Sequence, residues 1–283
     1  MTPDRMVIFT GLTEGQAETY GLVLSSAGIR HQSEKTHEGW TILVDDSDYD
    51  AALEAVREYV EENAELKDSD EYRYGRSTAG AWAGFLLLLS YLLIGSEAGS
   101  VQKYGASAAR ILDGELYRTA TALMVHLNDL HLAGNVVGIV VFGTAVCSIA
   151  GSGAGSLMIL ATGAIGNLAS ALLYKTDHLS AGASTAVFGA LGIVSAHQFC
   201  KKFRMPGRKM RSWIPIAGGL ALLGLLGSGK GSDLAAHLLG YIAGLILGVC
   251  HSAFLREPLG RTVQVSAILV TLAIIISCLI SAT

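Results

Sequence analysis

Residues 130–174 read LHLAGNVVGIVVFGTAVCSIAGSGAGSLMILATGAIGNLASALLY, without a single Asp, Glu, Lys or Arg. A helix needs about 20 apolar residues to cross a bilayer, so this stretch is long enough for two crossings. The run Ala150-Gly151-Ser152-Gly153-Ala154-Gly155-Ser156 interrupts it and predicts a tight turn between two helices. The stretch therefore indicates a polytopic α-helical membrane protein.

The rest of the chain extends this pattern. Five further stretches carry no charged residue and each predicts one more membrane helix, which makes seven in all: 77–96, 178–200, 212–229, 234–255 and 262–283. The composition agrees, because 51% of the residues are apolar and only 16% are charged, whereas soluble domains carry about 25% charged residues. These values exclude a disordered chain and argue against an ordinary soluble enzyme.

Charge is divided unevenly between the two parts of the chain. Residues 1–76 have a net charge of −10, and residues 77–283 have a net charge of +6. We therefore expect a soluble acidic head, residues 1–66, joined by a charged linker, residues 67–76, to an apolar body. The acidity of the head argues against nucleic acid as a partner. It leaves open a cytoplasmic partner for residues 1–66.

The head itself has the pattern of a small α/β domain of β-α-β-β-α order. The expected elements are a strand at 6–9, a helix at 13–27, strands at 29–33 and 39–44, and a helix at 48–66. Ser47 is the expected N-cap of the second helix. That helix has an apolar stripe, which predicts its buried face: Tyr49, Leu53, Val56, Tyr59 and Val60.

Lys and Arg predict the orientation in the membrane. The decisive cluster lies between two apolar stretches and comprises Lys201, Lys202, Arg204, Arg208, Lys209 and Arg211. With this loop inside, the N-terminus is cytoplasmic and the C-terminus outside. The first apolar run, Met6 to Leu12, is too short for a cleavable signal peptide. Without eukaryotic sorting signals, we expect a bacterial inner membrane.

Polar residues within apolar helices are costly, so they mark candidate functional sites. The segment Gly182-Ala183-Ser184-Thr185-Ala186-Val187-Phe188-Gly189 places Ser184 at the outer start of a helix. Backbone N–H groups are unpaired at a helix start, and a nucleophile beside such donors suits acyl transfer. Gly and Ser also occur in membrane helices for packing alone, so this segment does not decide the function by itself.

A second candidate group lies at the outer end of the sixth helix. His237 follows Ala236 and precedes Gly240 and Gly244, small residues four apart that let another helix come close. If that neighbour carries Ser184, the two side chains can form a hydrogen bond. Asp233 could complete a triad or cap the helix, and we favour the cap.

A third group precedes and enters the second membrane helix. It contains Glu115, Arg118, His126, His131 and Asn135. His131 and Asn135 are four residues apart, so they share a helix face and could donate hydrogen bonds to a developing oxyanion. No HExxH motif or third ligand accompanies the histidines, and the four cysteines lie in apolar stretches without metal-ligand spacing. We therefore expect neither metal nor cofactor.

Together these groups resemble the rhomboid family of intramembrane serine proteases. The matching elements, in order, are Tyr117-Arg118, His126, the pair His131 and Asn135, the motif Gly182-x-Ser184, and Ala236-His237 with Gly240 and Gly244. The resemblance covers residues 115–248. It implies a six-helix core over residues 77–255, followed by an additional C-terminal helix over residues 262–283.

The resemblance also implies roles for individual residues. Ser184 would be the nucleophile and His237 the general base, while Asn135, His131 and the Ser184 N–H would form the oxyanion hole. Phe188 would pack on the His237 ring, where the family often has Tyr. Arg118, Glu115 and His126 would support the loop between the first two helices. Thr185 stands where the family commonly has Gly, which could narrow the space beside the nucleophile.

The function implied is cleavage of transmembrane helices of protein substrates near the outer leaflet of the lipid bilayer. A non-catalytic membrane chaperone or client-binding protein is the alternative, although inactive relatives usually lack the Ser or the His. A transporter is disfavoured, because the spans show no inverted repeat and no carboxylate.

Overall fold

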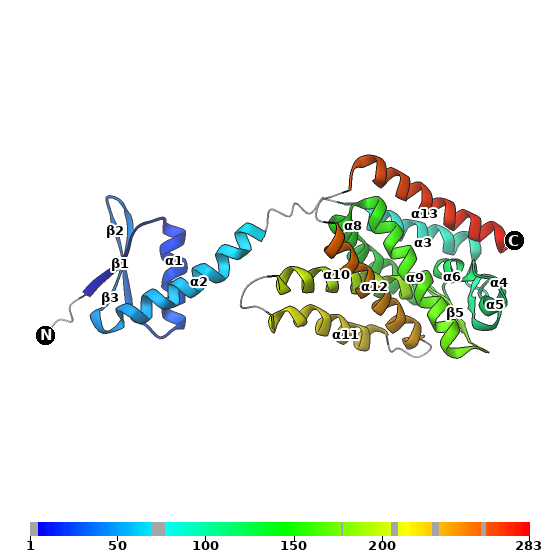
Figure 1. Cartoon of the computed structure of the whole chain (residues 1–283), viewed down its shortest axis with the longest axis horizontal. Coiled ribbons are helices and arrows are strands. Elements are labelled where there is room, and N and C mark those ends of the chain that lie inside the picture. The colour runs from blue at the N-terminus through cyan, green and yellow to red at the C-terminus, as the bar shows by residue number, and fades with distance from the viewer. Residues whose placement is uncertain (1–4, 70–76, 177, 205–208, 228–231, 256–258) are drawn as a thin grey trace. The chain divides into compact units, whose positions relative to one another are not determined.

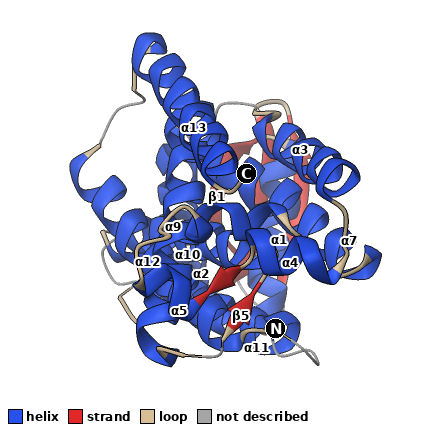
Figure 2. Ribbon diagram, turned by 90° about the vertical axis from the view of Figure 1, so that its right-hand side faces the viewer, coloured by secondary structure: helices blue, strands red, loops and turns tan. Residues whose placement is uncertain are grey.

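The computed structural model describes residues 5–69, 77–176, 178–204, 209–227, 232–255 and 259–283. The chain forms two compact units, Met1–Arg73 and Tyr74–Thr283. Figure 1 labels most of the helices and strands of both units, and Figure 2 shows that helix dominates the chain. The sequence prediction of an α-helical membrane body preceded by a small α/β region is confirmed.

The N-terminal unit has the predicted β-α-β-β-α order. Its elements are β1 (Arg5–Leu12), α1 (Glu14–Ser26), β2 (His31–Thr36), β3 (Gly39–Asp45), the 3-10 turn η1 (Asp46–Asp48) and α2 (Tyr49–Ser69). The strands form an antiparallel sheet in the order β1-β3-β2. Leu24 of α1, Ile42 and Val44 of β3, and Ala52 and Val56 of α2 are buried together as its core. Alternate residues of β3 thus face the helices, as the pleat of a strand requires.

Two local predictions for this unit are wrong. Ser47 does not cap α2, because it lies within the 3-10 turn η1, and α2 begins only at Tyr49. Leu53 and Val60 are each 39% exposed, whereas Ala52 is fully buried. The buried face of α2 is therefore rotated towards Ala52, which the apolar stripe did not include. Of the predicted linker, residues 70–76 lie outside the described residues.

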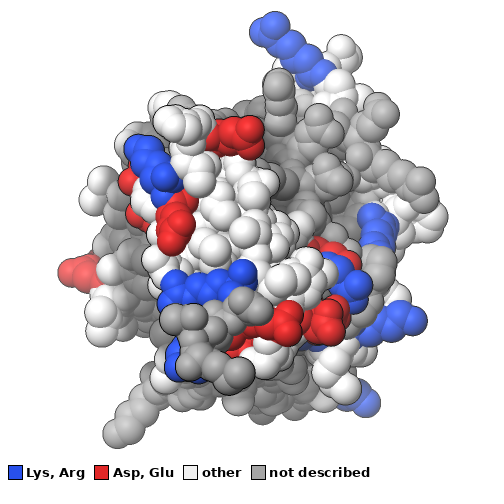
Figure 3. Space-filling view, turned by 90° about the vertical axis from the view of Figure 1, so that its left-hand side faces the viewer, with Lys and Arg blue, Asp and Glu red and all other residues white. Residues whose placement is uncertain are grey.

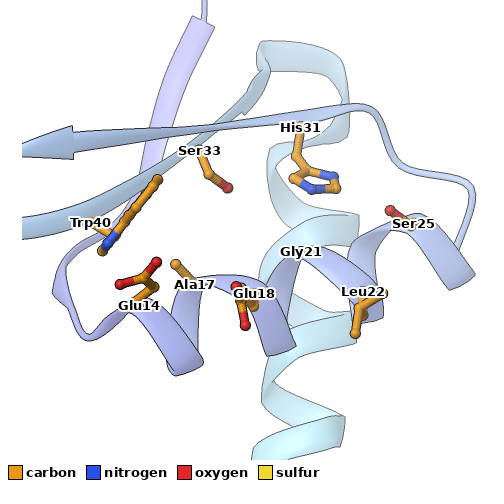
Figure 4. Close-up of a pocket in the computed structure, with 9 residues that line it drawn as sticks. All are labelled: Glu14, Ala17, Glu18, Gly21, Leu22, Ser25, His31, Ser33 and Trp40. Atoms are coloured by element: carbon orange, nitrogen blue, oxygen red, sulfur yellow. The ribbon is translucent and has the colours of Figure 1, made fainter.

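A shallow cavity of about 440 Å³ lies between α1 and the sheet of the N-terminal unit. Figure 4 shows Trp40 and Glu14 beside each other at one end, with His31 and Ser33 of β2 facing α1. Glu18 on the next turn of α1 also lines the cavity. Acidic and basic side chains are interspersed on the face shown in Figure 3, as expected for a water-exposed surface.

The second unit contains the apolar helices. The elements that precede α10 are α3 (Ala79–Ile94), α4 (Ala98–Tyr104), β4 (Ala106–Ser107), α5 (Ala108–Leu112), α6 (Arg118–Thr121), η2 (Ala122–Met124), α7 (Asp129–Gly138), η3 (Ile139–Gly143), α8 (Thr144–Ala150), α9 (Ser152–Tyr174) and β5 (Leu179–Ser180). They are followed by α10 (Ser184–Phe203), η4 (Arg211–Trp213), α11 (Ile214–Gly227), α12 (Leu234–Phe254) and α13 (Arg261–Ser281).

Four helices within the described residues are long and apolar enough to cross a membrane. They are Asp129–Ala150, which joins α7, η3 and α8, together with α9, α12 and α13. The bent pair α3 and α4, which turns by 116°, would count as a fifth. The other two of the seven predicted crossings correspond to α10 and α11. Helix α11 is shorter, and α10 carries several polar residues, which it tolerates because other helices cover it.

Helix α10 lies at the centre of this unit. It packs against α9, α11 and α12, and twelve of its residues are buried. Small residues allow this packing: a Cβ on Gly244 of α12 would collide with the backbone of Gly189 of α10. The predicted small-residue stripe on α12 therefore faces α10, and this contact positions the two helices that carry Ser184 and His237.

Gln264 anchors the last helix, α13, to the turn between α8 and α9. Its side-chain oxygen accepts hydrogen bonds from the N–H groups of Gly153 (2.8 Å) and Ala154 (3.0 Å). Its amide nitrogen donates to the carbonyl oxygen of Ala150 at 2.9 Å. One side chain thus satisfies unpaired groups at the end of α8 and at the start of α9.

Candidate active site

Ser184 and His237 meet between two packed helices. Ser184 is the first residue of α10, and His237 lies in the first turns of α12. The Oγ of Ser184 lies 2.7 Å from Nε2 of His237. The His237 side chain is buried, whereas Ser184 is half-buried. This geometry lets the imidazole accept the hydroxyl proton of the serine.

The other ring nitrogen of His237 is held by the backbone. Nδ1 lies 3.1 Å from the carbonyl oxygen of Gly227, the last residue of α11. A carbonyl can only accept, so Nδ1 carries the hydrogen and Nε2 is left as an acceptor facing Ser184. The Phe188 ring packs beside His237 with its centroid 4.8 Å away. Sequence analysis did not find Gly227, because nothing in its apolar surroundings distinguishes it.

His131 and Asn135 lie next to the segment that leads into Ser184. A Cβ built on Gly182 would lie 2.7 Å from Nε2 of His131 and 3.7 Å from the amide nitrogen of Asn135. Gly182 has a φ of +123°, so its backbone and its surroundings both require glycine. Asn135 donates one amide hydrogen to the carbonyl oxygen of His131 at 2.8 Å, which leaves its second hydrogen for another acceptor.

His126 forms a hydrogen bond with the same segment. Its Nε2 accepts a hydrogen bond from the N–H of Ala183 at 3.4 Å, directly before Ser184. Burial, with a smaller contribution from neighbouring His131, lowers the pKa of His126 to about 4. The ring is therefore neutral near pH 7 and available as an acceptor. Its contact is with the segment before the serine, rather than only with the loop that the sequence resemblance indicated.

Arg118 makes several hydrogen bonds within the segment that connects α3 to α7. Its Nε donates to the Glu115 carboxylate at 2.5 Å. Its Nη1 donates to three backbone carbonyl oxygens at the C-terminal end of α4, those of Gln102, Lys103 and Gly105. The hydrogen bond from Arg118 is the main reason that the pKa of Glu115 is lowered. The buried guanidinium of Arg118 thus joins the start of α6 to the end of α4 through several carbonyl groups.

Thr185 packs against glycines of two neighbouring helices. Its Cγ2 methyl would lie 2.5 Å from a Cβ on Gly166 of α9 and 2.9 Å from a Cβ on Gly240 of α12. The side chain is buried at the junction of α9, α10 and α12. Thr185 therefore fills space that these two glycines leave, and its effect on the space beside the nucleophile stays a prediction.

Asp233 caps α12 and does not contact the His237 ring. Its Oδ1 accepts from the Ala236 N–H at 2.9 Å, and its Oδ2 lies 2.6 Å from Nε2 of His178. Burial alone would raise the pKa of Asp233, but the Ala236 N–H and His178 outweigh it, and the pKa is lowered. Of the two sequence interpretations, the N-cap is confirmed.

The described residues contain no group of three or more His, Cys, Asp or Glu side chains placed to hold a metal ion. The site itself brings together a serine, an imidazole that faces it through Nε2 and nearby hydrogen-bond donors. This combination suits nucleophilic attack on a carbonyl group and stabilisation of the resulting oxyanion.

The sequence of the second unit is similar to known proteins. The family model described as Rhomboid domain matches residues 113–254, half of the chain. The chain is 36% identical over 113 residues to rhomboid protease GluP of Bacillus subtilis (strain 168), covering 38% of this chain and 22% of that protein. It is 25% identical over 137 residues to putative rhomboid protease YdcA of the same organism, covering 48% of this chain and 68% of that protein.

Proposed function

Because the chain belongs to the rhomboid family, we propose that it is an intramembrane serine endopeptidase with Ser184 as nucleophile and His237 as general base. The observation that carries the proposal is the 2.7 Å contact between Oγ of Ser184 and Nε2 of His237. The names of the two similar proteins, both rhomboid proteases, support the same activity.

The first chemical step is acylation of the serine. As Oγ of Ser184 bonds to the substrate carbonyl carbon, its proton moves to Nε2 of His237. The carbonyl oxygen becomes an oxyanion, which the Ser184 N–H and the side chains of Asn135 and His131 would stabilise. When the C–N bond breaks, His237 returns the proton to the leaving amine, and an acyl ester remains on Ser184.

Water completes the cycle. His237 accepts a proton from water as the hydroxide oxygen bonds to the ester carbonyl. The bond from that carbon to Oγ then breaks, and the proton returns to Ser184. Since Gly227 already holds Nδ1, the imidazole keeps the same tautomer in both halves of the reaction.

The substrates proposed are transmembrane segments of membrane proteins. A peptide bond inside a helix has its carbonyl engaged in the helix, so the substrate must unwind locally before Ser184 can attack it. The proposed setting is a bacterial inner membrane with the N-terminus in the cytoplasm and the site towards the outer leaflet. A cytoplasmic partner of residues 1–66 stays a prediction.

The test uses purified protein in detergent or liposomes. Wild type, Ser184→Ala and His237→Ala are incubated with a single-helix membrane substrate and, separately, with a fluorophosphonate probe that reacts with activated serines. Ser266→Ala, at an exposed position of α13, is the control. We expect cleavage and labelling by wild type and control only. Folded wild-type protein that neither cleaves nor labels would favour the client-binding alternative.

A further inference from the structure

The chain segments that carry Ser184 and His237 are joined by a second contact. Nε2 of His178, six residues before Ser184, lies 2.6 Å from Oδ2 of Asp233, four residues before His237. The Asp233 side chain is only 9% exposed and that of His178 is 23% exposed. The contact is thus largely shielded from water, where a hydrogen bond to a carboxylate is strongest.

On one side, Asp233 controls the first turn of α12. Its Oδ1 accepts from the Ala236 N–H at 2.9 Å, and its backbone oxygen accepts from the His237 N–H at 3.0 Å. Its Oδ2 also lies 3.5 Å from the Ser170 hydroxyl of α9. A shift of Asp233 would therefore be passed directly to the backbone that carries the His237 ring.

On the other side, His178 is fixed by its own surroundings. Its ring stacks on Tyr174, with centroids 3.9 Å apart and planes 19° apart. Its carbonyl oxygen accepts from the Ala108 N–H at 2.9 Å, and β5, which follows it directly, pairs with β4. These contacts hold the segment that carries the His178 imidazole, and the same segment continues to Gly182 and Ser184.

We propose that His178 and Asp233 form a positioning pair that sets the approach of His237 to Ser184. This inference rests on the proposed function. The Ser184–His237 contact is a single hydrogen bond between side chains at the starts of two separate helices, so small rotations of either helix would break it. Proton transfer depends steeply on such distances. The pair fixes the two helix starts relative to each other without touching the reacting atoms.

The pair positions the two helix starts, and Asp233 does not act as the carboxylate of a Ser-His-Asp triad. The Asp233 carboxylate is occupied by Ala236 and His178, and Nδ1 of His237 is occupied by Gly227. Loss of a triad carboxylate costs about 10⁴-fold in turnover. A displacement of about 1 Å costs about 10²-fold, and the smaller shift expected from one lost positioning contact costs less, so the size of the loss separates the two roles.

The test compares His178→Ala, His178→Gln, Asp233→Asn and the double variant His178→Ala/Asp233→Asn in the same detergent. Asn is a good N-cap, so Asp233→Asn keeps the cap and removes the charge. His37→Ala, at an exposed position of the N-terminal unit, is the matched control. The measurements are the rate of fluorophosphonate labelling, kcat and KM on a single-helix substrate, and the melting temperature.

We expect His178→Ala and Asp233→Asn each to lower the labelling rate and kcat about tenfold, with KM little changed. The double variant should lose no more than either single variant, because both changes remove one contact. His178→Gln, which keeps an N–H donor, should recover most of the rate. A role in stability alone would lower the melting temperature and leave the labelling rate of folded protein unchanged.

The outcomes separate this inference from the proposed function. If wild type and His37→Ala react with the probe and folded His178→Ala reacts at the same rate, the positioning role is wrong and the protease proposal stands. If the reductions in labelling rate of the two single variants multiply in the double variant, the two residues act independently and the proposed pair is wrong. If folded wild type does not react at all, both proposals fail. Should His178→Ala not fold, the labelling rates of His178→Gln and Asp233→Asn are compared. A slow Asp233→Asn beside a nearly normal His178→Gln supports the pair, and equal, normal rates contradict it.

Discussion

Nδ1 of His237 lies 3.1 Å from the carbonyl oxygen of Gly227, so a backbone oxygen at the end of α11 orients the imidazole. In Ser-His-Asp triads a carboxylate performs this task. A carbonyl oxygen fixes the same tautomer and leaves Nε2 facing Ser184, although it carries no full charge to stabilise an imidazolium. The approach of α11 to α12 is therefore part of the proposed site, since it places that oxygen.

Gly227→Ala is expected to slow the reaction without unfolding the protein. The added Cβ would lie 3.2 Å from Nδ1 of His237 and 3.2 Å from Cζ of Phe188, tighter than ordinary contact. The ring must shift away from its orienting oxygen, and we expect fluorophosphonate labelling to slow about tenfold. Gly218→Ala, on the same helix with open space around it, is the matched control. Equal rates for both variants would contradict the role of Gly227.

Gly240→Ala is expected to separate α10 from α12. Its Cβ would collide with the carbonyl oxygen of Thr185 and lie 2.9 Å from the Thr185 methyl. Overpacking of this kind costs about 1–3 kcal/mol, and here it acts directly beside Ser184. We expect a lower melting temperature and loss of labelling. Thr185→Ser removes the methyl but not the carbonyl oxygen, so it should not rescue Gly240→Ala.

The control for this prediction is Gly134→Ala on α7, where an added Cβ meets nothing within 4 Å. That variant should melt and label like wild type. If Gly240→Ala keeps full labelling, the close approach of the two helices is not what brings Ser184 to His237. Melting temperature and labelling rate on the same preparations provide the comparison.

The sequence predicted those features that depend on local pattern. Uncharged stretches locate membrane helices because a charge is costly in lipid, and the spacing of Gly240 from Gly244 marks a close helix contact. The contacts of Gly227, His178 and Gln264 could not be predicted. Each joins segments far apart in the chain and uses a backbone group or a side chain that is common elsewhere. The exposed positions of Leu53 and Val60 have a similar cause, because tertiary packing selected Ala52 instead.

Gln264→Ala is expected to destabilise the membrane unit. It removes the acceptor for the N–H groups of Gly153 and Ala154 and the donor for the Ala150 carbonyl. A buried group left unpaired costs about 1–3 kcal/mol. A loss of about 2 kcal/mol corresponds to roughly 4–8 °C in melting temperature for a unit of this size. Gln264→Glu keeps the acceptor for the two N–H groups but turns an oxygen towards the Ala150 carbonyl oxygen, so it should not restore the stability of wild type.

The matched control is Ser266→Ala, an exposed position two residues further along α13. Thermal melting of all three variants in one detergent measures the effect. A melting temperature of Gln264→Ala equal to that of Ser266→Ala would show that the anchor contributes nothing to stability.

His126 makes stability depend on pH in the acidic range. Its pKa is lowered from 6.5 to about 4 in the folded protein, mainly by burial. Below pH 6.5 the unfolded chain therefore binds a proton at this position that the folded chain does not bind. The contribution to stability is complete above pH 6.5 and falls as pH decreases, by up to about 1.4 kcal/mol per pH unit, until about pH 4.

The measurement is the melting temperature of wild type and His126→Asn at intervals from pH 4 to pH 8. The variant cannot titrate there, so the difference between the two proteins should change with pH below 6.5 and stay constant above it. Histidines other than the neighbouring His131 affect both proteins alike and cancel in the difference. Parallel curves would mean that His126 has its ordinary pKa in the fold. Below pH 4, a protonated His126 can no longer accept a hydrogen bond from the Ala183 N–H.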